Sequence, residues 1–307
     1  MTHYCLLTND VETTSIWFNS LRDETGLKVL REGMPLLLDI YEKYNIKSTF
    51  FFTGYIAKLY PDIVRMIIPY GHEVGSHAMS HKIEDGFDIL DFESQKKQLA
   101  ESKKILEDIS GQEVISFRSP ALRVNRHTPQ ALIETGFKID SSIASTRFDA
   151  FFSFGTKQKY KWLFAPRLPY ITRDDDLTRR GNNGLIEVPL SATLFPYVGT
   201  TMRIFPGITA MQHLLLNFET KRIRNKPIVF DIHPNEFIDE SDERREILRR
   251  SNNYFSFLLK DMLRSKLKTK NLGPRAIPIY EREIKYFHSK EYEFTTLEKY
   301  CKRYNFL

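Results

Sequence analysis

The chain has 307 residues, of which 41% are hydrophobic and 27% charged, and it contains 14 glycines and 14 prolines. This composition is typical of a globular protein and excludes disordered, collagen-like and coiled-coil classes. The net charge of +6 permits attraction to phosphates or anionic lipid surfaces but demonstrates neither. We expect no nucleic-acid partner, because only the charge would support one.

Two features of the chain concern its compartment. The two cysteines, Cys5 and Cys301, are too few for a disulfide framework and favour a reducing environment. The first residues contain no basic stretch followed by an apolar one, so we expect no signal peptide and a cytoplasmic location. Every apolar cluster is far shorter than the ~20 residues that span a bilayer.

Strand and helix patterns alternate along most of the chain. Short apolar runs indicate strands, and longer runs with helical spacing indicate helices that end at glycines, such as Gly111. The predicted strands are 4–7, 48–52, 72–76, 114–117, 137–139, 185–190 and 228–232, and the predicted helices are 27–44, 62–68, 92 to the stop at Gly111, 128–135 and 208–218. This alternation indicates a parallel α/β sheet, either open or closed.

The alternation breaks between residues 141 and 184, where aromatic residues are interleaved with basic ones. A loop of this length is usually functional or disordered, and this one is too aromatic for disorder. It could stack on sugar rings and bind phosphates, or it could form a small local core, and both alternatives stay open. Its members are Phe148, Phe151, Phe152, Phe154, Tyr160, Trp162, Phe164 and Tyr170, with Lys157, Lys159, Lys161, Arg167 and Arg173.

Four polar clusters follow predicted strands, at 8–12, 77–81, 118–120 and 231–236. In a parallel α/β architecture the carboxyl ends of the strands meet on one face, where active sites lie. We therefore expect these four clusters to form a single site.

Two histidines and two carboxylates in these clusters suggest a metal centre. His77 and His81 alone could be surface residues, and Asp10 or Glu12 alone could cap a helix. Together, two imidazoles and one carboxylate form a common catalytic Zn²⁺ set with open positions for water and substrate. Since side chains at i and i+2 of an extended segment point the same way, one carboxylate could bind the metal while the other takes a proton from water.

Arg118 and His233 complete the predicted site. Arg118 could pair with a surface acid, but beside Asp10 it would hold that carboxylate ionised and oriented. His233 follows an apolar strand and could donate a proton to a leaving group. As an isolated residue it would more often be a packed histidine.

The four clusters resemble, in order, motifs of the polysaccharide deacetylase family, which is carbohydrate esterase family 4 with the nodulation-deacetylase homology fold. TNDVE resembles its first motif, GHEVGSHAMSH its second, FRSP its third and DIHPNE its last. The resemblance extends from about Leu6 to Glu236 and includes the strand region 47–54. The segment 294–296 also resembles the family's closing segment.

The sequence departs from the common family pattern at three places. Val11 separates Asp10 from Glu12, where the commonest first motif has adjacent aspartates. By analogy with members that carry D-x-D, we assign Asp10 as the base and Glu12 as the ligand, although the two roles could be exchanged. Ala121 replaces the usual aromatic residue of the third motif, and Asp140 lies near the fourth motif without its tryptophan.

The resemblance implies a distorted (β/α)7 TIM-like barrel forming a single domain over residues 1–307. The core would occupy 1–240, with the aromatic and basic insertion inside it and a C-terminal helical extension at 241–307. It also implies metal-dependent removal of an N-acetyl group from an amino sugar, with Zn²⁺ as the expected ion and Co²⁺ or another divalent ion as alternatives. An oxyanion donor is expected among the backbone N–H groups of 119–121. The implied roles are metal ligands Glu12, His77 and His81, base Asp10, acid His233 and orienting residue Arg118.

The expected substrate is a cytoplasmic N-acetylated sugar linked to a nucleotide or a lipid carrier, and the basic excess would suit its phosphates. Residues 185–191 and 193–206 could border the cleft near a membrane surface, which makes peripheral membrane contact an expectation. Two alternatives remain: a hydrolase of a small amide or ureide, and a catalytically silent glycan-binding protein. The complete set of site residues argues against silence. The sequence predicts no oligomeric state.

Overall fold

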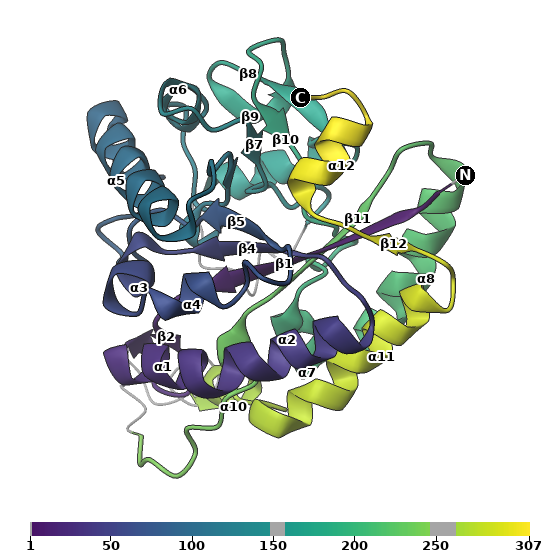
Figure 1. Ribbon diagram of the computed structural model, residues 1–307. Coiled ribbons are helices and arrows are strands. Elements are labelled where there is room, and N and C mark those ends of the chain that lie inside the picture. The colour runs from purple at the N-terminus through teal and green to yellow at the C-terminus, as the bar shows by residue number, and fades with distance from the viewer. Residues whose placement is uncertain (1, 148–156, 246–261) are drawn as a thin grey trace.

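The computed structural model describes residues 2–147, 157–245 and 262–307. Its centre is a curled sheet of parallel strands in the order β11–β1–β4–β5–β6–β7–β10, extended by the antiparallel strands β8 and β9 (Figure 1). The strands are β1 (Tyr4–Val11), β4 (Thr49–Phe52), β5 (Glu73–Ser76), β6 (Ser116–Phe117), β7 (Ile139–Asp140), β8 (Tyr170–Arg173), β9 (Asp176–Arg180), β10 (Ile186–Glu187) and β11 (Ile228–Ile232).

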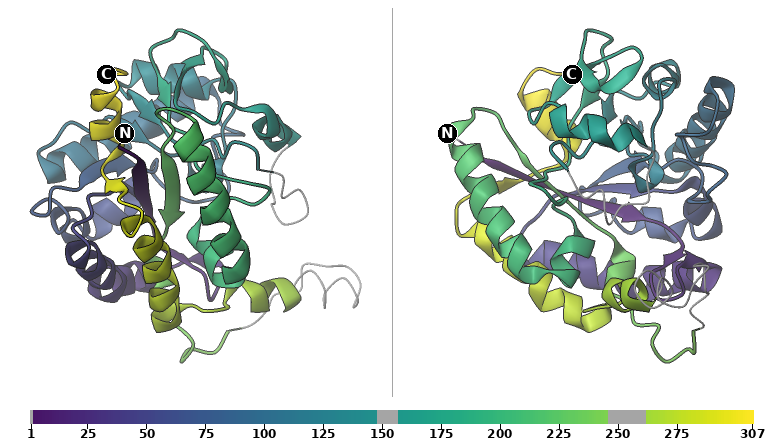
Figure 2. Two further views of the ribbon diagram at one scale, coloured as in Figure 1. Left: turned by 90° about the vertical axis from the view of Figure 1, so that its right-hand side faces the viewer. Right: turned by 180° about the vertical axis from the view of Figure 1, so that it is seen from behind.

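Helices cover the outside of this sheet (Figures 1 and 2). The longest, α5, begins where Asp91 accepts a hydrogen bond from the Ser94 N–H and ends at Gly111 with φ 67°. The helices are α1 (Asp23–Lys28), η1 (Val29–Gly33), α2 (Met34–Lys43), α3 (Gly54–Leu59), α4 (Asp62–Arg65), α5 (Phe92–Ser110), η2 (Pro120–Leu122), α6 (Thr128–Glu134), η3 (Lys157–Phe164), α7 (Gly199–Ile204), α8 (Pro206–Arg222), η4 (Pro234–Glu236), α10 (Leu263–Lys268), η6 (Gly273–Arg275), α11 (Ala276–His288) and α12 (Leu297–Arg303).

The chain beyond β10 brings the two sides of the sheet together. The Ser191 N–H donates to the Val229 carbonyl at 3.0 Å, and Val198 forms a parallel bridge with Asp231. These contacts connect the end of β10 to β11 without a long shared strand. The distorted (β/α)7 barrel predicted for this sequence is therefore confirmed.

Strand β1 is longer than its apolar pattern predicts, since it continues from Leu7 to Val11. Among the added residues, Thr8, Asn9 and Asp10 are polar yet buried, and their side chains find partners inside the protein. The Asn9 amide donates to Ser48 Oγ at 2.7 Å, and the Tyr41 hydroxyl donates to Asn9 Oδ1 at 2.6 Å. The extension places Asp10, a predicted site residue, within a fixed strand.

Several elements were absent from the predicted set, among them α3 and the β8–β9 hairpin. The short helix α3 follows β4, with the Thr53 hydroxyl accepting from the Ile56 N–H. The aromatic and basic insertion contains the β8–β9 hairpin, although a loop was expected there. Trp162 and Tyr170 are buried, as the local-core alternative expects, but Phe164 is 86% exposed. Phe148, Phe151, Phe152 and Phe154 lie outside the described residues.

The C-terminal segment packs against the barrel. A short hairpin forms from β2 (Thr14–Ser15) and β3 (Ser20–Leu21), and β12 (Glu293–Phe294) pairs in parallel with β1. The hydroxyls of Tyr41 and Tyr280 lie 2.8 Å apart between α2 and α11. The boundary between the core and the C-terminal extension, predicted at residue 240, stays a prediction.

Over the part of the chain that the structure describes, no helix has the length and apolar character needed to cross a membrane.

Candidate metal centre and catalytic site

The predicted site residues converge at the carboxyl ends of the parallel strands. β1 carries the two acids, β5 leads into the two histidines, and β6 and β11 lead into the arginine and the third histidine. The fold therefore brings all six predicted residues together: Asp10, Glu12, His77, His81, Arg118 and His233.

One part of the cluster has the geometry of a metal site. The ligand atoms of Glu12, His77 and His81 all lie within 4.8 Å of one another, and Glu12 Oε2 is 3.3 Å from His81 Nε2. Glu12 Oε2 and His77 Nε2 are buried atoms without a hydrogen-bond partner among the described residues. Burying such atoms unsatisfied costs free energy, so the donor set fits a divalent cation that would satisfy both.

The His77 ring is oriented for this role. Its Nδ1 lies 2.8 Å from the Arg118 carbonyl oxygen, and a ring N–H bonded to a carbonyl leaves the other nitrogen free to bind metal. Burial lowers the pKa of His77 to about 3, which keeps the ring neutral. Burial raises the pKa of Glu12, but the neighbouring His81, His233 and His77 outweigh this effect and hold it below its usual range. A neutral imidazole and an ionised carboxylate are the forms that bind cations.

Arg118 connects the three candidate metal ligands, Glu12, His77 and His81, to the rest of the site. Its buried guanidinium donates from Nη1 to Asp10 Oδ1 at 3.0 Å and to Asp231 Oδ1 at 2.6 Å. Nη1 also donates to Thr8 Oγ1 at 2.8 Å, and Nε donates to the Ser141 carbonyl at 2.9 Å. These bonds fix one oxygen of Asp10 and leave Oδ2 facing the cluster, 3.7 Å from His77 Nε2.

Replacing Arg118 by methionine is expected to destabilise the protein by about 3–5 kcal/mol, because Asp10 and Asp231 would stay buried without their shared cation. Urea unfolding monitored by circular dichroism measures the change. Arg126→Met is the matched control, since Arg126 is exposed and its loss should cost less than about 0.5 kcal/mol. Equal stabilities for the two variants would show that the Arg118 network does not hold the site.

His233 lies on the other side of Asp10. Its Nε2 is 4.0 Å from Asp10 Oδ2 and 3.9 Å from Glu12 Oε1, while its Nδ1 is 3.4 Å from Glu236 Oε1 and 3.9 Å from Asp231 Oδ2. Burial lowers the pKa of His233, but the hydrogen bond to Glu236 and the surrounding carboxylates outweigh it and raise the pKa to about 10. The ring is therefore cationic at neutral pH in this arrangement.

The residue that holds Glu236 could not be predicted from the sequence. This carboxylate pairs with the guanidinium of Arg203 from α7, and both side chains are buried. Arg203 Nη1 also donates to the carbonyls of Lys268 and Lys270 at 3.0 and 2.8 Å. Glu236 lay within a predicted cluster, but no motif or periodicity marks Arg203.

Asp140, near the family's fourth motif, does not contact His233. It accepts from the Ser142 hydroxyl at 2.6 Å, and it lies beside Glu187, its partner in the β7–β10 register. Burial raises the pKa of Asp140, and burial together with Asp140 raises that of Glu187. The carboxylates beside the Nδ1 atom of His233 are instead Asp231 and Glu236.

Of the three residues 119–121 expected to supply an oxyanion donor, only Ala121 has a backbone N–H available for a ligand. The Ser119 N–H donates to Ser142 Oγ at 2.9 Å, and Pro120 has no N–H. Ala121 adopts φ 51°, which is uncommon for an L-residue and typical of constrained functional segments. Among the described residues its N–H finds no acceptor in the protein, so it can donate to a ligand.

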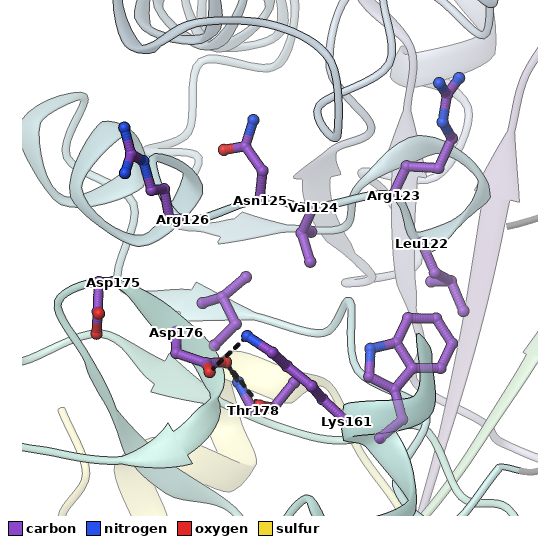
Figure 3. Close-up of a pocket in the computed structure, with 11 residues that line it drawn as sticks. Leu122, Arg123, Val124, Asn125, Arg126, Lys161, Asp175, Asp176 and Thr178 are labelled. Carbon is purple, nitrogen blue, oxygen red and sulfur yellow. Dashed lines mark hydrogen bonds and ion pairs between the residues drawn. The ribbon is translucent and has the colours of Figure 1, made fainter. Parts of the chain in front are cut away.

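Two pockets border this region. One is next to the metal group and is lined by Glu12, His81, Tyr55 and Lys82, among others. The second begins at Leu122, just beyond the oxyanion segment (Figure 3). Its lining residues are Leu122, Arg123, Val124, Asn125, Arg126, Lys161, Trp162, Asp175, Asp176, Leu177 and Thr178. Figure 3 shows the Lys161 ammonium directed to Asp176, at 3.1 Å.

Comparison with known proteins agrees with this arrangement. The profile of the family described as polysaccharide deacetylase matches residues 16–139, which include both predicted metal histidines. The peptidoglycan deacetylase of Helicobacter pylori is 25% identical over 150 residues, which cover 47% of this chain and 50% of that protein. The chain spans half or less of the length of the first curated relatives that it matches.

Solved structures share the fold over nearly the whole chain. A Pseudomonas aeruginosa structure, named as that of a probable polysaccharide deacetylase, has a TM-score of 0.63 and 14% identity, covering 97% of this chain and 89% of that one. The PuuE allantoinase has a TM-score of 0.62 and 13% identity, with the same two coverages. At such identities the likeness concerns the fold alone. The profile match over residues 16–139 and the ordered motifs show that this chain resembles the polysaccharide deacetylase family.

Proposed function

We propose that this protein removes the N-acetyl group from an amino sugar by metal-dependent hydrolysis. The observation that carries the proposal is the juxtaposition of Glu12, His77 and His81 with Asp10, whose one oxygen is held by Arg118. The likeness to a protein named peptidoglycan deacetylase supports an acylated sugar as the substrate. A set of this kind brings a water molecule, a base and an acceptor for negative charge to one place.

Glu12, His77 and His81 would hold the metal, and we propose Zn²⁺ because two imidazoles and one carboxylate are a common catalytic set for that ion. Co²⁺ or another divalent ion suits the same ligands, and availability decides between them. Once bound, the ion would polarise the attacking water and the amide carbonyl.

Asp10 acts as the base in this proposal. Its Oδ2 faces Glu12, His77 and His81, while the bond from Arg118 to Oδ1 keeps the carboxylate oriented. Asp10 takes a proton from the water as the oxygen attacks the amide carbon. Glu12 is the better ligand, since its free oxygen lies beside His81 and it has no contact with Arg118 among the described residues.

The remaining steps use Ala121 and His233. The Ala121 N–H donates a hydrogen bond to the carbonyl oxygen as that oxygen gains negative charge. Protonated His233 then gives its proton to the amide nitrogen, so the C–N bond breaks and the products are acetate and a free amine on the sugar. Glu236 and Asp231 hold the imidazolium in place through Nδ1.

For the substrate, we propose an N-acetylated sugar linked through phosphate to a nucleotide or a lipid carrier, in the cytoplasm. The pocket beyond Leu122 supports phosphate binding through Arg126, which has no carboxylate partner among the described residues. The other two lining cations, Arg123 and Lys161, pair with Asp88 and Asp176. The net charge of +6 agrees with an anionic substrate. The thiols of Cys5 and Cys301 are both free, which agrees with a reducing compartment.

Acetate release from N-acetyl sugars in free, nucleotide-linked and lipid-linked forms tests the proposal. We expect release only with a phosphate-linked sugar, loss of release with a chelator, and recovery when Zn²⁺ or Co²⁺ is added. Turnover of small amides or ureides, with all sugars inert, would replace the proposed substrate class. Tight metal binding without turnover of any substrate would favour the silent binding protein instead.

A further inference from the structure

Helix α8 buries mostly polar side chains and exposes apolar ones, which is the reverse of an ordinary surface helix. Such a helix buries its apolar face and exposes its polar one. In α8 the buried residues are mostly polar: Thr209, Gln212, His213 and Thr220 are buried together with Leu216.

The buried polar side chains of α8 are satisfied by specific bonds. Gln212 Nε2 donates to Thr193 Oγ1 at 3.1 Å and to the Phe195 carbonyl at 2.8 Å. His213 Nδ1 lies 3.0 Å from Glu283 Oε2 on α11. These contacts fix which face of α8 points inward. The opposite face therefore points outward because of the fold, and not because the helix is loosely attached.

The outward face is an apolar stripe with helical spacing. Met211, Leu214, Leu215 and Phe218 occur at i, i+3, i+4 and i+7, and each is between 50% and 57% exposed. Leu194, next to the Thr193 that bonds to Gln212, is 62% exposed. Figure 2 shows α8, the green helix facing the viewer in its left view, along the outside of the barrel. Contiguous exposed apolar side chains of this kind mark a contact surface.

The charges beside the stripe are positive. Lys221, Arg222 and Arg224 follow it at the C-terminal end of α8 and are exposed, and the Arg222 guanidinium lies 4.1 Å from the centre of the Phe218 ring. Glu219 is the one acid in the sequence of α8, and it is already paired with Arg167 at 2.5 Å and with Lys226 at 3.2 Å.

This charge pattern selects between two occupants of the stripe. If a second copy of the chain packed its α8 in parallel on this one, the three cations of one copy would lie against the same three cations of the other. An antiparallel copy would place them against residues 206–210, which contain no acid. An anionic lipid surface supplies both apolar acyl chains and negative headgroups, as basic amphipathic helices at membrane interfaces require.

We propose that α8 is a membrane-docking element, with its apolar stripe (Met211, Leu214, Leu215 and Phe218) inserted at the interface of an anionic bilayer and its basic end on the headgroups. The contact is peripheral and independent of catalysis. It needs no part of the proposed metal centre, so the two proposals can fail separately.

Co-sedimentation with vesicles tests the proposal, using phosphatidylcholine with phosphatidylglycerol and phosphatidylcholine alone. The wild type should bind the anionic vesicles, and added salt should weaken binding. Leu214→Gln/Leu215→Gln/Phe218→Gln should weaken binding about 100-fold or more, and Lys221→Gln/Arg222→Gln about 30-fold.

Ile83→Gln/Ile89→Gln is the matched control, because both isoleucines are exposed and lie outside α8. It should bind like the wild type, as should the metal-ligand variant His77→Ala. Thermal unfolding of the α8 variants should match the wild type, since the altered side chains point outward. Absence of vesicle binding would overturn the proposal, and so would a wild-type dimer in analytical ultracentrifugation that only the triple α8 variant abolishes.

Discussion

Replacing His77 by alanine is expected to abolish metal binding and to reduce acetate release below about a thousandth of the wild-type rate. The variant removes the buried Nε2 that has no partner among the described residues, and the two remaining ligands, Glu12 and His81, would bind the ion weakly. Metal content after dialysis, measured by atomic emission, and initial rates of acetate release provide the two readouts.

The control for this variant is His288→Ala, since His288 is an exposed histidine at the end of α11. It should keep full metal content and activity. Far-ultraviolet circular dichroism separates loss of metal from loss of fold, because His77→Ala also removes the contact with the Arg118 carbonyl. A folded His77→Ala protein with undiminished metal content would refute the assigned ligand set.

Replacing Asp10 by asparagine is expected to lower kcat by about 10²–10⁴-fold while the protein retains its metal, the loss typical of removing a general base. Asparagine keeps the size of the side chain and an oxygen that can accept from Arg118, but it cannot take a proton from water. KM should change little, because the lost interaction belongs to the transition state. Steady-state kinetics and metal analysis of the same preparation measure both effects.

Glu12→Gln is the matched comparison, since it neutralises the other buried carboxylate of the pair. We expect it to weaken metal binding, whereas Asp10→Asn should not. The opposite outcome, with metal lost from Asp10→Asn and retained by Glu12→Gln, would show that the two acids exchange their roles. The pair of variants therefore decides a question that the spacing of the first motif left open.

Residues close in sequence and placed at strand ends could be predicted well. Asp10 and Glu12, and likewise His77 and His81, lie within five residues of each other, and each pair follows an apolar strand. In a parallel sheet those ends must meet, so local pattern and architecture together predicted the site. The insertion was predicted less well. A loop was expected there, and the pairing of β8 with β9 could not be read from its aromatic and basic composition.

The partners of His233 could not be predicted in the same way. Arg203 meets Glu236 only because α7 packs beside η4, and Asp231 joins Arg118 only because β11 pairs with β1. Such contacts join residues separated by tens to hundreds of positions, and no local periodicity encodes them. Their effect on His233 depends on burial, which a sequence does not state.

The sequence by itself determined the alternation of strands and helices, and the types of side chain available for metal binding and proton transfer. These follow from local periodicity and from the chemistry of each residue. Only the tertiary structure decided which oxygen of Asp10 is held by Arg118, which atoms of Glu12 and His77 are left unsatisfied, and which face of α8 is outward. Each of these depends on the packing of distant segments, because burial and hydrogen-bond satisfaction are properties of the folded chain.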